Sequence, residues 1–481
     1  MLRINSCSDR TLRIAATVVV FAMFGAFAVY AIGKLSDSHQ LLLGQNSTAG
    51  VAKVGTAGEG KEVCIVNQFV PAGTELIRVS TSDKRSLDSV IRVVPHEGDR
   101  EASLRGPPKR VVDARGNIRL PLETRLEHAG RRSFCIEASG KPVELLGVAE
   151  FDRDPSTKLI VNGRSVNREI ALGFFSTSGT VGGELGAVLK RAAMFKPGLV
   201  TPATIAIVLA LVLMLLLTTL AIMVTGRGSN FSARRWILLI ALVTIVNGTA
   251  WAVITPQFQP PDEQEHFAYV DTLMNRGVPH ETEPPGAYTP ALQNTLSVTW
   301  RGIVLNRDVK PPWNTDVERA WQAGQRKLRS KDDEASSVTS AAGYSPLYYA
   351  IAGVPLELGG SSYTNSLWLI RLLSVLMTAG AAIFAFLAAR ELRAEPWWFA
   401  PATGLIVGSL PMLLHIGAAV HPDAMLNMLA AALVWSVAIV FRRGLSLRRA
   451  LTVTGIFGLM FVVKPVAAGL APALLVAAII A

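Results

Sequence analysis

The sequence has few cysteines, few charges and no tryptophan in a long early segment. Three of its 481 residues are cysteines, and only 17% are charged. It contains no glycine-rich phosphate loop and no paired-cysteine metal motif, which disfavours the usual nucleotide-binding and zinc-site classes. Half of the residues are instead hydrophobic, too many for one soluble domain.

Long apolar runs predict an α-helical polytopic membrane protein. About 20 apolar residues in a helix cross the hydrocarbon core, because lipid offers backbone groups no partners. Three early runs qualify: Ile14–Ile32, Ala203–Val224 and Trp236–Ile254. Later spans are expected at 366–389, 399–419 and 424–441, followed by apolar residues 451–463 and a final apolar run that suggests a truncated chain. The segment 344–358 is short and interrupted by proline, so we expect it to be re-entrant or interfacial.

Basic residues outnumber acidic ones by 47 to 36. In a soluble protein this excess would suggest nucleic acid as a partner. Here the arginines cluster beside apolar runs, so we expect the lipid bilayer and no nucleic acid. The positive-inside rule then predicts a multi-pass protein of the cytoplasmic membrane with its N-terminus inside. The first run lacks a clear small-x-small cleavage site before Gly33, so an uncleaved anchor is preferred to a signal peptide.

Residues 35–199 predict an extracytoplasmic β-sandwich inserted after the first span. Short runs such as "EVCIVNQFV" (62–70) and "RSFCIEAS" (132–139) alternate apolar and polar residues between turn formers. Cys64 and Cys135 lie in these runs, and an oxidising compartment favours a disulfide over two buried thiols. Without tryptophan, sugar binding by this domain is no better supported than a spacer or assembly role.

The predicted order is a cytoplasmic N-terminus with an anchor (1–34), the β-sandwich (35–199), two spans (200–254), an outer loop (255–343) and further helices (344–481). Just before the second span, residues 183–195 predict a short amphipathic helix. A loop as long as 255–343 is usually functional. Within it, 317–329 predicts a helix that lies on the membrane surface or packs on the core of the loop.

The loop begins with "QPPDEQEHFAY" (259–269), which is rich in prolines and acidic residues. If Pro260 or Pro261 occupies the first helical turn, Asp262, Glu263 and His266 fall on one face, because they are three and four positions apart. The positive end of the helix dipole favours ionised carboxylates there, which suits a base or a metal ligand. Ordinary helix capping explains the same residue types.

Four stretches in order resemble a bacterial membrane family called domain of unknown function 2142: "PPDEQEHF" (260–267), "YSPLYYA" (344–350), "HPDAMLN" (421–427) and "VKPVAAGLAP" (463–472). The resemblance covers roughly Trp236 to the end. That family is similar to the GT-C glycosyltransferases. A GT-C-like fold is thus implied, with transfer of a sugar from a polyprenyl-phosphate donor to a cell-envelope glycan acceptor outside the membrane.

The resemblance makes Asp262 the first candidate for the base that deprotonates the acceptor. Glu263 is the alternative, or joins Asp262 in holding a divalent cation such as Mg²⁺ or Mn²⁺, and His266 belongs to the same site. Lys464 and Arg371 are candidates for binding the leaving phosphate, although snorkelling explains Arg371 equally well. Further candidates for substrate binding, with plainer explanations as caps or interfacial residues, are His421, Asp423, Trp313 and Trp321.

Two other classes of function remain open. One is a non-catalytic scaffold or sensor, whose sandwich contacts a partner. The other is a transporter of lipid-linked sugars, which would need polar residues spread through the bilayer midplane. Here the polar residues collect at the predicted outer ends of spans, and the lack of a nucleotide motif disfavours a cytoplasmic nucleotide-sugar donor.

Overall fold

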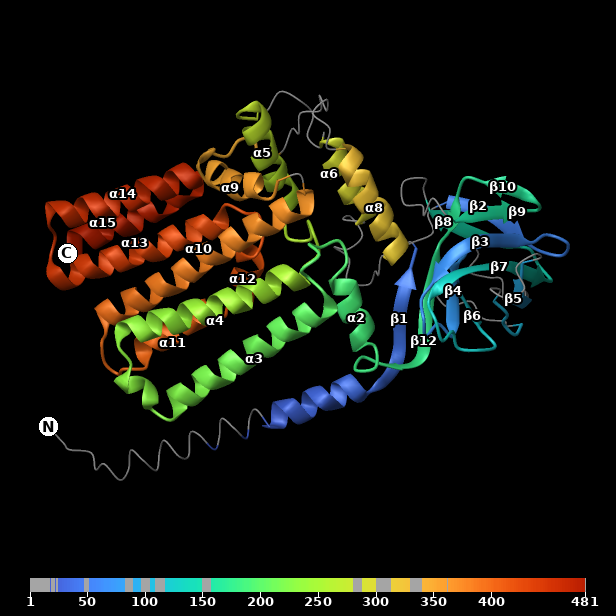
Figure 1. The fold of residues 1–481 in the computed structure, drawn as a ribbon, viewed down its shortest axis with the longest axis horizontal. Coiled ribbons are helices and arrows are strands. Elements are labelled where there is room, and N and C mark those ends of the chain that lie inside the picture. The colour runs from blue at the N-terminus through green and yellow to red at the C-terminus, as the bar shows by residue number, and fades with distance from the viewer. Residues whose placement is uncertain are drawn as a thin grey trace. The chain divides into compact units, whose positions relative to one another are not determined.

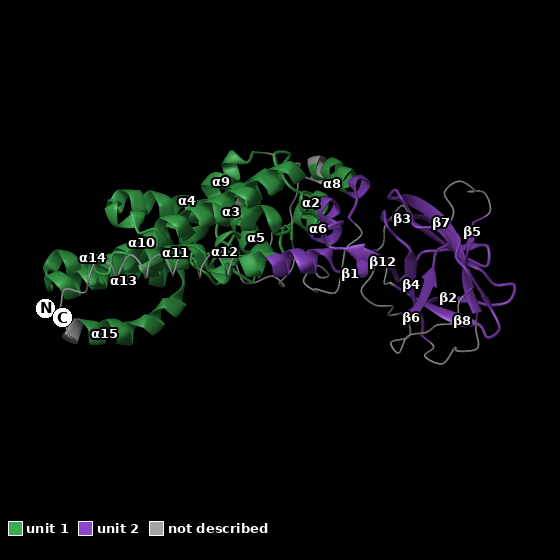
Figure 2. Ribbon diagram, turned by 90° about the horizontal axis from the view of Figure 1, so that it is seen from below, with its two compact units in different colours: residues 1–28, 188–295, 318–481 green, residues 29–187, 296–317 purple. Residues whose placement is uncertain are grey.

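The computed structural model describes residues 18, 22, 25–46, 52–82, 90–96, 104–108, 117–148, 157–279, 288–299, 313–328, 340–360 and 362–480. The chain divides into two compact units, coloured green and purple in Figure 2. Unit 1 comprises residues 1–28, 188–295 and 318–481, and unit 2 comprises residues 29–187 and 296–317. Of the predicted first span, residues 18, 22 and 25–32 are helical, and the rest lies outside the described residues.

Unit 2 is rich in β-strands. They are β1 (Ser38–Gln45), β2 (Ala52–Ala57), β3 (Val63–Val70), β4 (Leu76–Ser80), β5 (Val90–Pro95), β6 (Asn117–Pro121), β7 (Gly130–Ser139), β8 (Val143–Val148), β9 (Lys158–Val161), β10 (Arg164–Val166), β11 (Glu169–Ile170) and β12 (Leu172–Thr180). Antiparallel pairing gives sheets in the orders β1-β12-β4-β6, β10-β9-β3-β7-β5 and β11-β8-β2. The β-rich character is therefore confirmed, and the sandwich arrangement stays a prediction.

The alternation in the sequence has the expected structural consequence. In β5, Ile91 and Val93 are buried while Arg92 between them is exposed, because successive strand residues face opposite sides. The buried side chains of several strands join one hydrophobic core that includes Phe134 and Phe174. Burial of this shared apolar face holds the sheets together.

Cys64 on β3 and Cys135 on β7 are direct cross-strand partners and form a disulfide. The bond joins positions 71 residues apart, which restricts the unfolded chain. Under denaturing conditions, alkylation should modify only Cys7 before reduction and all three cysteines afterwards, as counted by mass spectrometry. Replacing both partners with alanine should cost about 2–4 kcal/mol of stability in this unit. Labelling of Cys64 or Cys135 without a reductant would contradict the assignment.

The helices that are long and apolar enough to cross a membrane, among the described residues, are α3 (Pro202–Val224), α4 (Ala233–Ile254), α10 (Tyr363–Leu392) and α13 (Asp423–Arg443). The bent pair α11 (Phe399–Val407) and α12 (Pro411–Gly417) gives a fifth if it counts as one span. These findings confirm a membrane protein with several apolar helices. The predicted span 399–419 corresponds to this pair, which bends by 52° next to Pro411, a residue that cannot donate a backbone hydrogen bond.

Shorter helices complete the chain (Figure 1). They are α2 (Leu185–Ala192), η2 (Arg227–Asn230), α5 (Glu263–Arg276), α6 (Pro290–Val298), α8 (Thr315–Leu328), α9 (Leu347–Leu358), α14 (Leu447–Val463), η3 (Pro465–Leu470) and α15 (Ala471–Ile480). The segment predicted as re-entrant or interfacial thus forms the short apolar helix α9, with Pro355 inside it. Its place relative to a bilayer stays a prediction.

Helix α10 is the centre of the bundle in unit 1. More than half of its most apolar window is buried, against 11% for α3, and it packs on α4, α9, α11, α12 and α13. Small residues permit this close packing: a Cβ atom on Gly417 of α12 would lie 2.0 Å from the hydroxyl of Thr378 on α10. The exposed apolar surface of α3 is the kind that lipid covers.

Charge is distributed unevenly between the two ends of these helices. Arginines gather where α3, α10 and α13 end and where α4 and α14 begin: Arg227, Arg234, Arg235, Arg390, Arg393, Arg442, Arg443, Arg448 and Arg449. The opposite ends, namely the end of α4, the starts of α10 and α13, and the end of α14, carry both signs of charge. The candidate site lies at these opposite ends.

Candidate functional site

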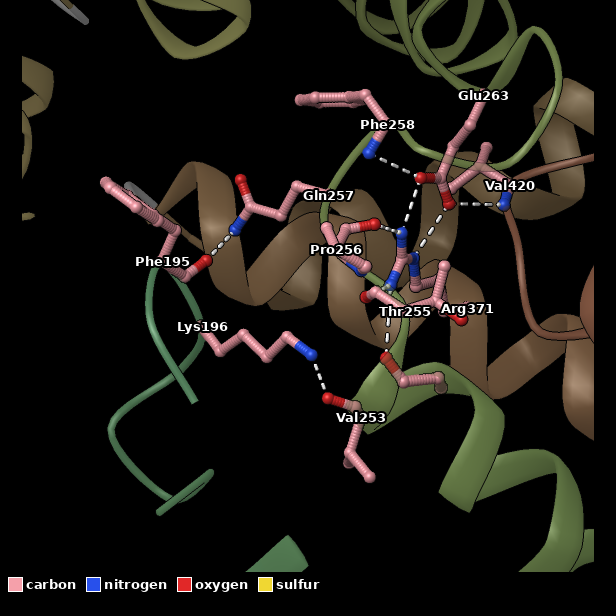
Figure 3. Close-up of polar contacts among 11 residues, drawn as sticks. Phe195, Lys196, Val253, Thr255, Pro256, Gln257, Phe258, Glu263, Arg371 and Val420 are labelled. Carbon is pink, nitrogen blue, oxygen red and sulfur yellow. Dashed lines mark hydrogen bonds and ion pairs between the residues drawn. The ribbon is translucent and has the colours of Figure 1, made fainter. Parts of the chain in front are cut away.

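Glu263 and Arg371 form a fully buried ion pair (Figure 3). Glu263 is the first residue of α5, and Arg371 lies in the third turn of α10. Arg371 donates from Nε to Oε1 at 2.7 Å and from Nη2 to Oε2 at 2.5 Å. The backbone N–H groups of Phe258 and Val420 donate to the same carboxylate at 2.8 and 3.1 Å. Four donors therefore satisfy both oxygens of Glu263.

The rest of the Arg371 guanidinium holds the end of α4. It donates to the carbonyls of Ala252, Thr255 and Pro256 at 2.8 to 3.1 Å. The last carbonyls of a helix lack partners within the helix, and a buried cation is a favourable partner for them. Arg371 thus fixes the turn that leads from the span into "QPPDEQEHFAY".

Lys196 adds a second cation to this turn. Its ammonium donates to the carbonyl of Val253, and the neighbouring Phe195 carbonyl accepts from the side chain of Gln257. Burial lowers the pKa of Lys196 well below its usual value, nearby Arg371 lowers it further, and Glu263 opposes the shift. Lys196 could not be predicted from a local pattern, because it precedes α3 and is 57 residues from its partner Val253.

These contacts exclude Glu263 as a base or metal ligand and Arg371 as a phosphate-binding residue. Glu263 has no oxygen left for a metal or an acceptor proton, and a cation would meet the guanidinium of Arg371. Arg371 in turn is only 1% exposed and has no face toward a substrate phosphate. The predicted metal pair of Asp262 and Glu263 therefore does not fit a divalent cation.

The other potential metal ligands are equally unsuited to a cation. Within the part of the chain that the structure describes, one group of three potential ligand residues lies close together: Glu62, Cys64 and Cys135. Both cysteine sulfurs in that group belong to the disulfide. No catalytic step through a metal is derived from these residues.

Asp262 is separated from Glu263 although it is the preceding residue. Helix α5 begins at Glu263, so Pro260 and Pro261 precede the helix instead of occupying its first turn. Asp262 adopts a left-handed backbone conformation with φ of 55°, and its side chain is exposed, whereas those of Glu263 and His266 are buried. The expected start of the helix at Pro260 or Pro261 is therefore wrong, and the shared orientation of Asp262 with Glu263 and His266 stays a prediction. What remains is one exposed carboxylate at a helix start.

His266 and His421 lie in contact below this carboxylate. Their rings meet edge to face with centroids 4.4 Å apart, and Nδ1 of His266 lies 2.9 Å from the hydroxyl of Tyr349. Nδ1 of His421 accepts the backbone N–H of Asp423 at 3.1 Å, which leaves the proton of the neutral ring on Nε2. Burial lowers the pKa of His421, an effect that the carboxylates of Asp423 and Asp262 oppose. Asp262 is thus within electrostatic reach of this ring.

Lys464 completes the cluster at the end of α14. Its ammonium binds Oδ1 of Asp423 at 2.8 Å and lies 5.4 Å from the centre of the Tyr344 ring. Both members of this ion pair are partly exposed, unlike Glu263 and Arg371. Asp423 also occupies the first turn of α13, where the helix dipole favours its charge. We call Asp262, His266, His421, Asp423 and Lys464 the polar cluster.

Residues 245–481 match the family described as predicted membrane protein, domain of unknown function 2142. The match covers 237 of the 481 residues, so this part of the chain is similar to that family. The matched residues contain the whole polar cluster and the Glu263–Arg371 pair. No curated protein and no solved structure matches the chain. The likeness to GT-C glycosyltransferases accordingly stays a prediction.

Sequence reasoning missed several residues of the family segment that shape the cluster. The Tyr344 ring lies near the Lys464 ammonium, and the Tyr349 hydroxyl contacts His266. The Tyr348 hydroxyl accepts the backbone N–H of His421 at 2.9 Å. All three tyrosines belong to "YSPLYYA", so the clustering of tyrosines in this segment was the sequence feature that could have predicted their role. Glu265 was also missed: it accepts from the hydroxyl of Tyr288 and from the backbone N–H of Ser340, and so ties two parts of the outer loop to α5.

The two predicted sugar-stacking tryptophans are not part of the cluster. Trp321 on α8 is 3% exposed, donates to the hydroxyl of Thr295 at 3.1 Å and packs edge to face on Phe195. Trp321 thus packs on Thr295 of the loop and on Phe195 before it, and the position of this helix relative to the membrane surface stays a prediction. Trp313 belongs to unit 2, so no role at the cluster is derived for it.

The buried His266 predicts loss of stability in acid. Burial lowers its pKa to about 2, and His421 and Lys464 contribute in the same direction. The unfolded chain, with a histidine pKa of about 6.5, takes up the proton first, so stability is full above that pH and decreases as the pH falls. The expected loss is about 1.4 kcal/mol for each pH unit below 6.5.

This prediction can be checked by thermal unfolding in detergent between pH 7.5 and 5.0. His266→Asn should be less stable at pH 7.5, because it loses the Tyr349 contact, but should show a weaker pH dependence than the wild type. His128→Asn, which alters an exposed histidine of unit 2, is the control and should keep the wild-type dependence. An unchanged pH dependence in His266→Asn would rule out the buried neutral imidazole as its source.

Proposed function

We propose that the protein is a GT-C-like membrane glycosyltransferase that transfers a sugar from a polyprenyl-phosphate donor to a cell-envelope glycan acceptor on the extracytoplasmic side. The observation that carries the proposal is the composition of the polar cluster. One exposed carboxylate, Asp262, stands at the start of α5, and one partly exposed cation, Lys464, binds Asp423, whose backbone N–H donates to His421. A base and a phosphate-binding cation are the two groups that such a transfer needs.

The charge distribution of the helices supports the side on which the reaction takes place. The arginine-rich helix ends face the cytoplasm under the positive-inside rule, so the polar cluster at the opposite ends faces outward. A lipid phosphate in the outer leaflet lies at the depth where spans end. In this proposal Lys464, which follows the last residue of α14, binds that phosphate.

In the proposed reaction the acceptor hydroxyl attacks the anomeric carbon of the donor sugar. As the new glycosidic bond forms, the hydroxyl proton passes to the Asp262 carboxylate and the bond to the phosphate oxygen breaks. Polyprenyl phosphate leaves with the electron pair, and the new negative charge is stabilised by the Lys464 ammonium. The attack on the opposite face inverts the anomeric centre.

Two further residues have positioning roles in this proposal. Asp423 holds the Lys464 ammonium at 2.8 Å and so fixes where the phosphate binds. His421, with its proton on Nε2, can donate to a phosphate or sugar oxygen without carrying charge. Neither residue gains or loses a proton in the reaction.

The direct test is transfer by the purified protein in nanodiscs. A panel of radiolabelled polyprenyl-phosphate sugars would be offered with cell-envelope glycans, and product followed by chromatography. The proposal expects transfer from at least one donor with inversion, and no transfer when the same sugar is supplied as a nucleotide sugar. If folded protein transfers nothing from any donor and a variant of Asp262 still complements a deletion strain, the non-catalytic scaffold reading replaces this one.

A further inference from the structure

A cavity of about 360 Å³ lies in unit 1, and no residue of the polar cluster lines it. It is bounded by the segment before α3, by α8 and by the start of α10. This volume is within the range of small-molecule sites, about 300–1,000 Å³. Its polar lining is made mainly of uncharged groups, from Gln322, Gln325, Ser362, Thr364 and Asn365.

The one charged side chain in the lining is Lys196, and its ammonium is used elsewhere. It donates to the carbonyl of Val253 and is directed into the turn that Arg371 holds (Figure 3). Lys196 is only 6% exposed. An anionic ligand would therefore find no available cation in this lining, whereas neutral donors and acceptors are present.

Gln325 supplies a fixed amide to the cavity. Its nitrogen donates to the carbonyl of Ala291 at 3.0 Å and to the hydroxyl of Thr295 at 2.8 Å. Its oxygen is buried and has no hydrogen-bond partner among the described residues. A buried acceptor without a donor is costly, and a ligand hydroxyl would remove that cost.

Trp321 supplies a fixed ring to the same cavity. Its indole N–H is held by the hydroxyl of Thr295, so the orientation of the ring is set before any ligand arrives. Because Trp321 is only 3% exposed, it contributes a rigid apolar part of the wall and not an open stacking face, and the surrounding amides and hydroxyls match the O–H groups of a sugar. Ordered groups of both kinds lower the entropy cost of binding.

We propose that this cavity binds a neutral sugar residue. This inference rests on the proposed function: the bound sugar is part of the acceptor glycan. The two sites are linked through α5, because Tyr363 in the cavity packs on Phe267 with centroids 4.6 Å apart, and Phe267 follows His266 of the polar cluster on that helix. In this proposal the acceptor chain extends from the cavity toward Asp262.

Binding is tested without any donor or transfer. The full chain in nanodiscs would be titrated with methyl glycosides of glucose, galactose, mannose and arabinose, followed by saturation-transfer-difference NMR. Gln322→Ala combined with Asn365→Ala removes two exposed amides of the lining without emptying a packed core. Loss of two hydrogen bonds should weaken binding about tenfold or more. Gln293→Ala, an exposed glutamine of α6 outside the lining, is the control and should bind like the wild type.

Three results would overturn the site: no glycoside binds the folded protein, the double variant binds as tightly as the wild type, or inorganic phosphate displaces the glycoside. Displacement by phosphate would indicate an anion site instead. Because binding is read directly, it can be separated from the proposed reaction. Glycoside binding without transfer in the donor assay rejects the glycosyltransferase and keeps the sugar site, whereas transfer without binding here rejects the sugar site alone.

Discussion

Asn in place of Asp262 is expected to lower the rate of sugar transfer by about 10²- to 10⁴-fold, the usual contribution of a general base. Asn keeps the size and polarity of the side chain but cannot take up the acceptor proton at neutral pH. The affinity for the donor should change little, because Lys464 and not Asp262 meets the phosphate. The effect should therefore appear in kcat and not in the KM for the donor.

The substitution is chosen because it leaves the fold intact. Asp262 has a φ of 55°, a left-handed conformation that Asn tolerates as well as Asp and most other residues tolerate poorly. Its side chain caps no backbone group of α5. Thermal unfolding of Asp262→Asn should therefore match the wild type, so that a loss of activity reports chemistry and not misfolding.

The matched control is Glu357→Gln, which neutralises an exposed carboxylate on α9 outside the polar cluster. It should transfer sugar at the wild-type rate. Equal rates for Asp262→Asn and wild type, measured at saturating acceptor, would exclude Asp262 as the base. A rate that falls in both variants would point instead to general loss of negative charge at this end of the helices.

The apolar helices were predictable because their signal is local. The predicted runs Ala203–Val224 and Trp236–Ile254 correspond to α3 and α4 within three residues, since each span depends on its own length and hydropathy. The β-rich nature of unit 2 followed from alternation in the same way. The bend between α11 and α12 was missed, because an apolar composition continues across Pro411 and hides the break.

The candidate site was harder to predict, because its contacts join distant positions. The local sequence does not distinguish the roles of Asp262 and Glu263, because both are acidic and they follow the same two prolines. Only the partner 108 residues away, Arg371, makes one of them a buried structural group. The left-handed turn at Asp262 then sends the other to the surface. Neither contact nor conformation can be read from hydrophobic periodicity, whereas the family resemblance did predict a match that includes residues 260–267.

Removing the charge of Glu263 is expected to destabilise unit 1 by about 3–5 kcal/mol, because it leaves a buried guanidinium without its counter-ion. In Glu263→Gln the amide nitrogen would also face donor groups of Arg371, Phe258 and Val420. The variant should therefore unfold at a lower temperature in detergent, and any loss of sugar transfer should follow the loss of folded protein.

A second ion pair between an acidic and a basic residue in unit 1 provides the control. Glu391 at the end of α10 and Arg443 at the end of α13 pair at 2.9 Å, but Arg443 is 58% exposed in its side chain. Glu391→Gln should cost no more than about 1 kcal/mol, because water and salt screen an exposed pair.

The double variant Glu263→Gln with Arg371→Met separates the pair from its other contacts. It should recover part of the lost stability, because no unpaired charge remains, but not all of it, since the carbonyls of Ala252, Thr255 and Pro256 lose their donor. A Glu263→Gln protein with wild-type thermal stability but no transfer would contradict a structural role. It would return Glu263 to the chemistry, with Asp262 as its exposed neighbour.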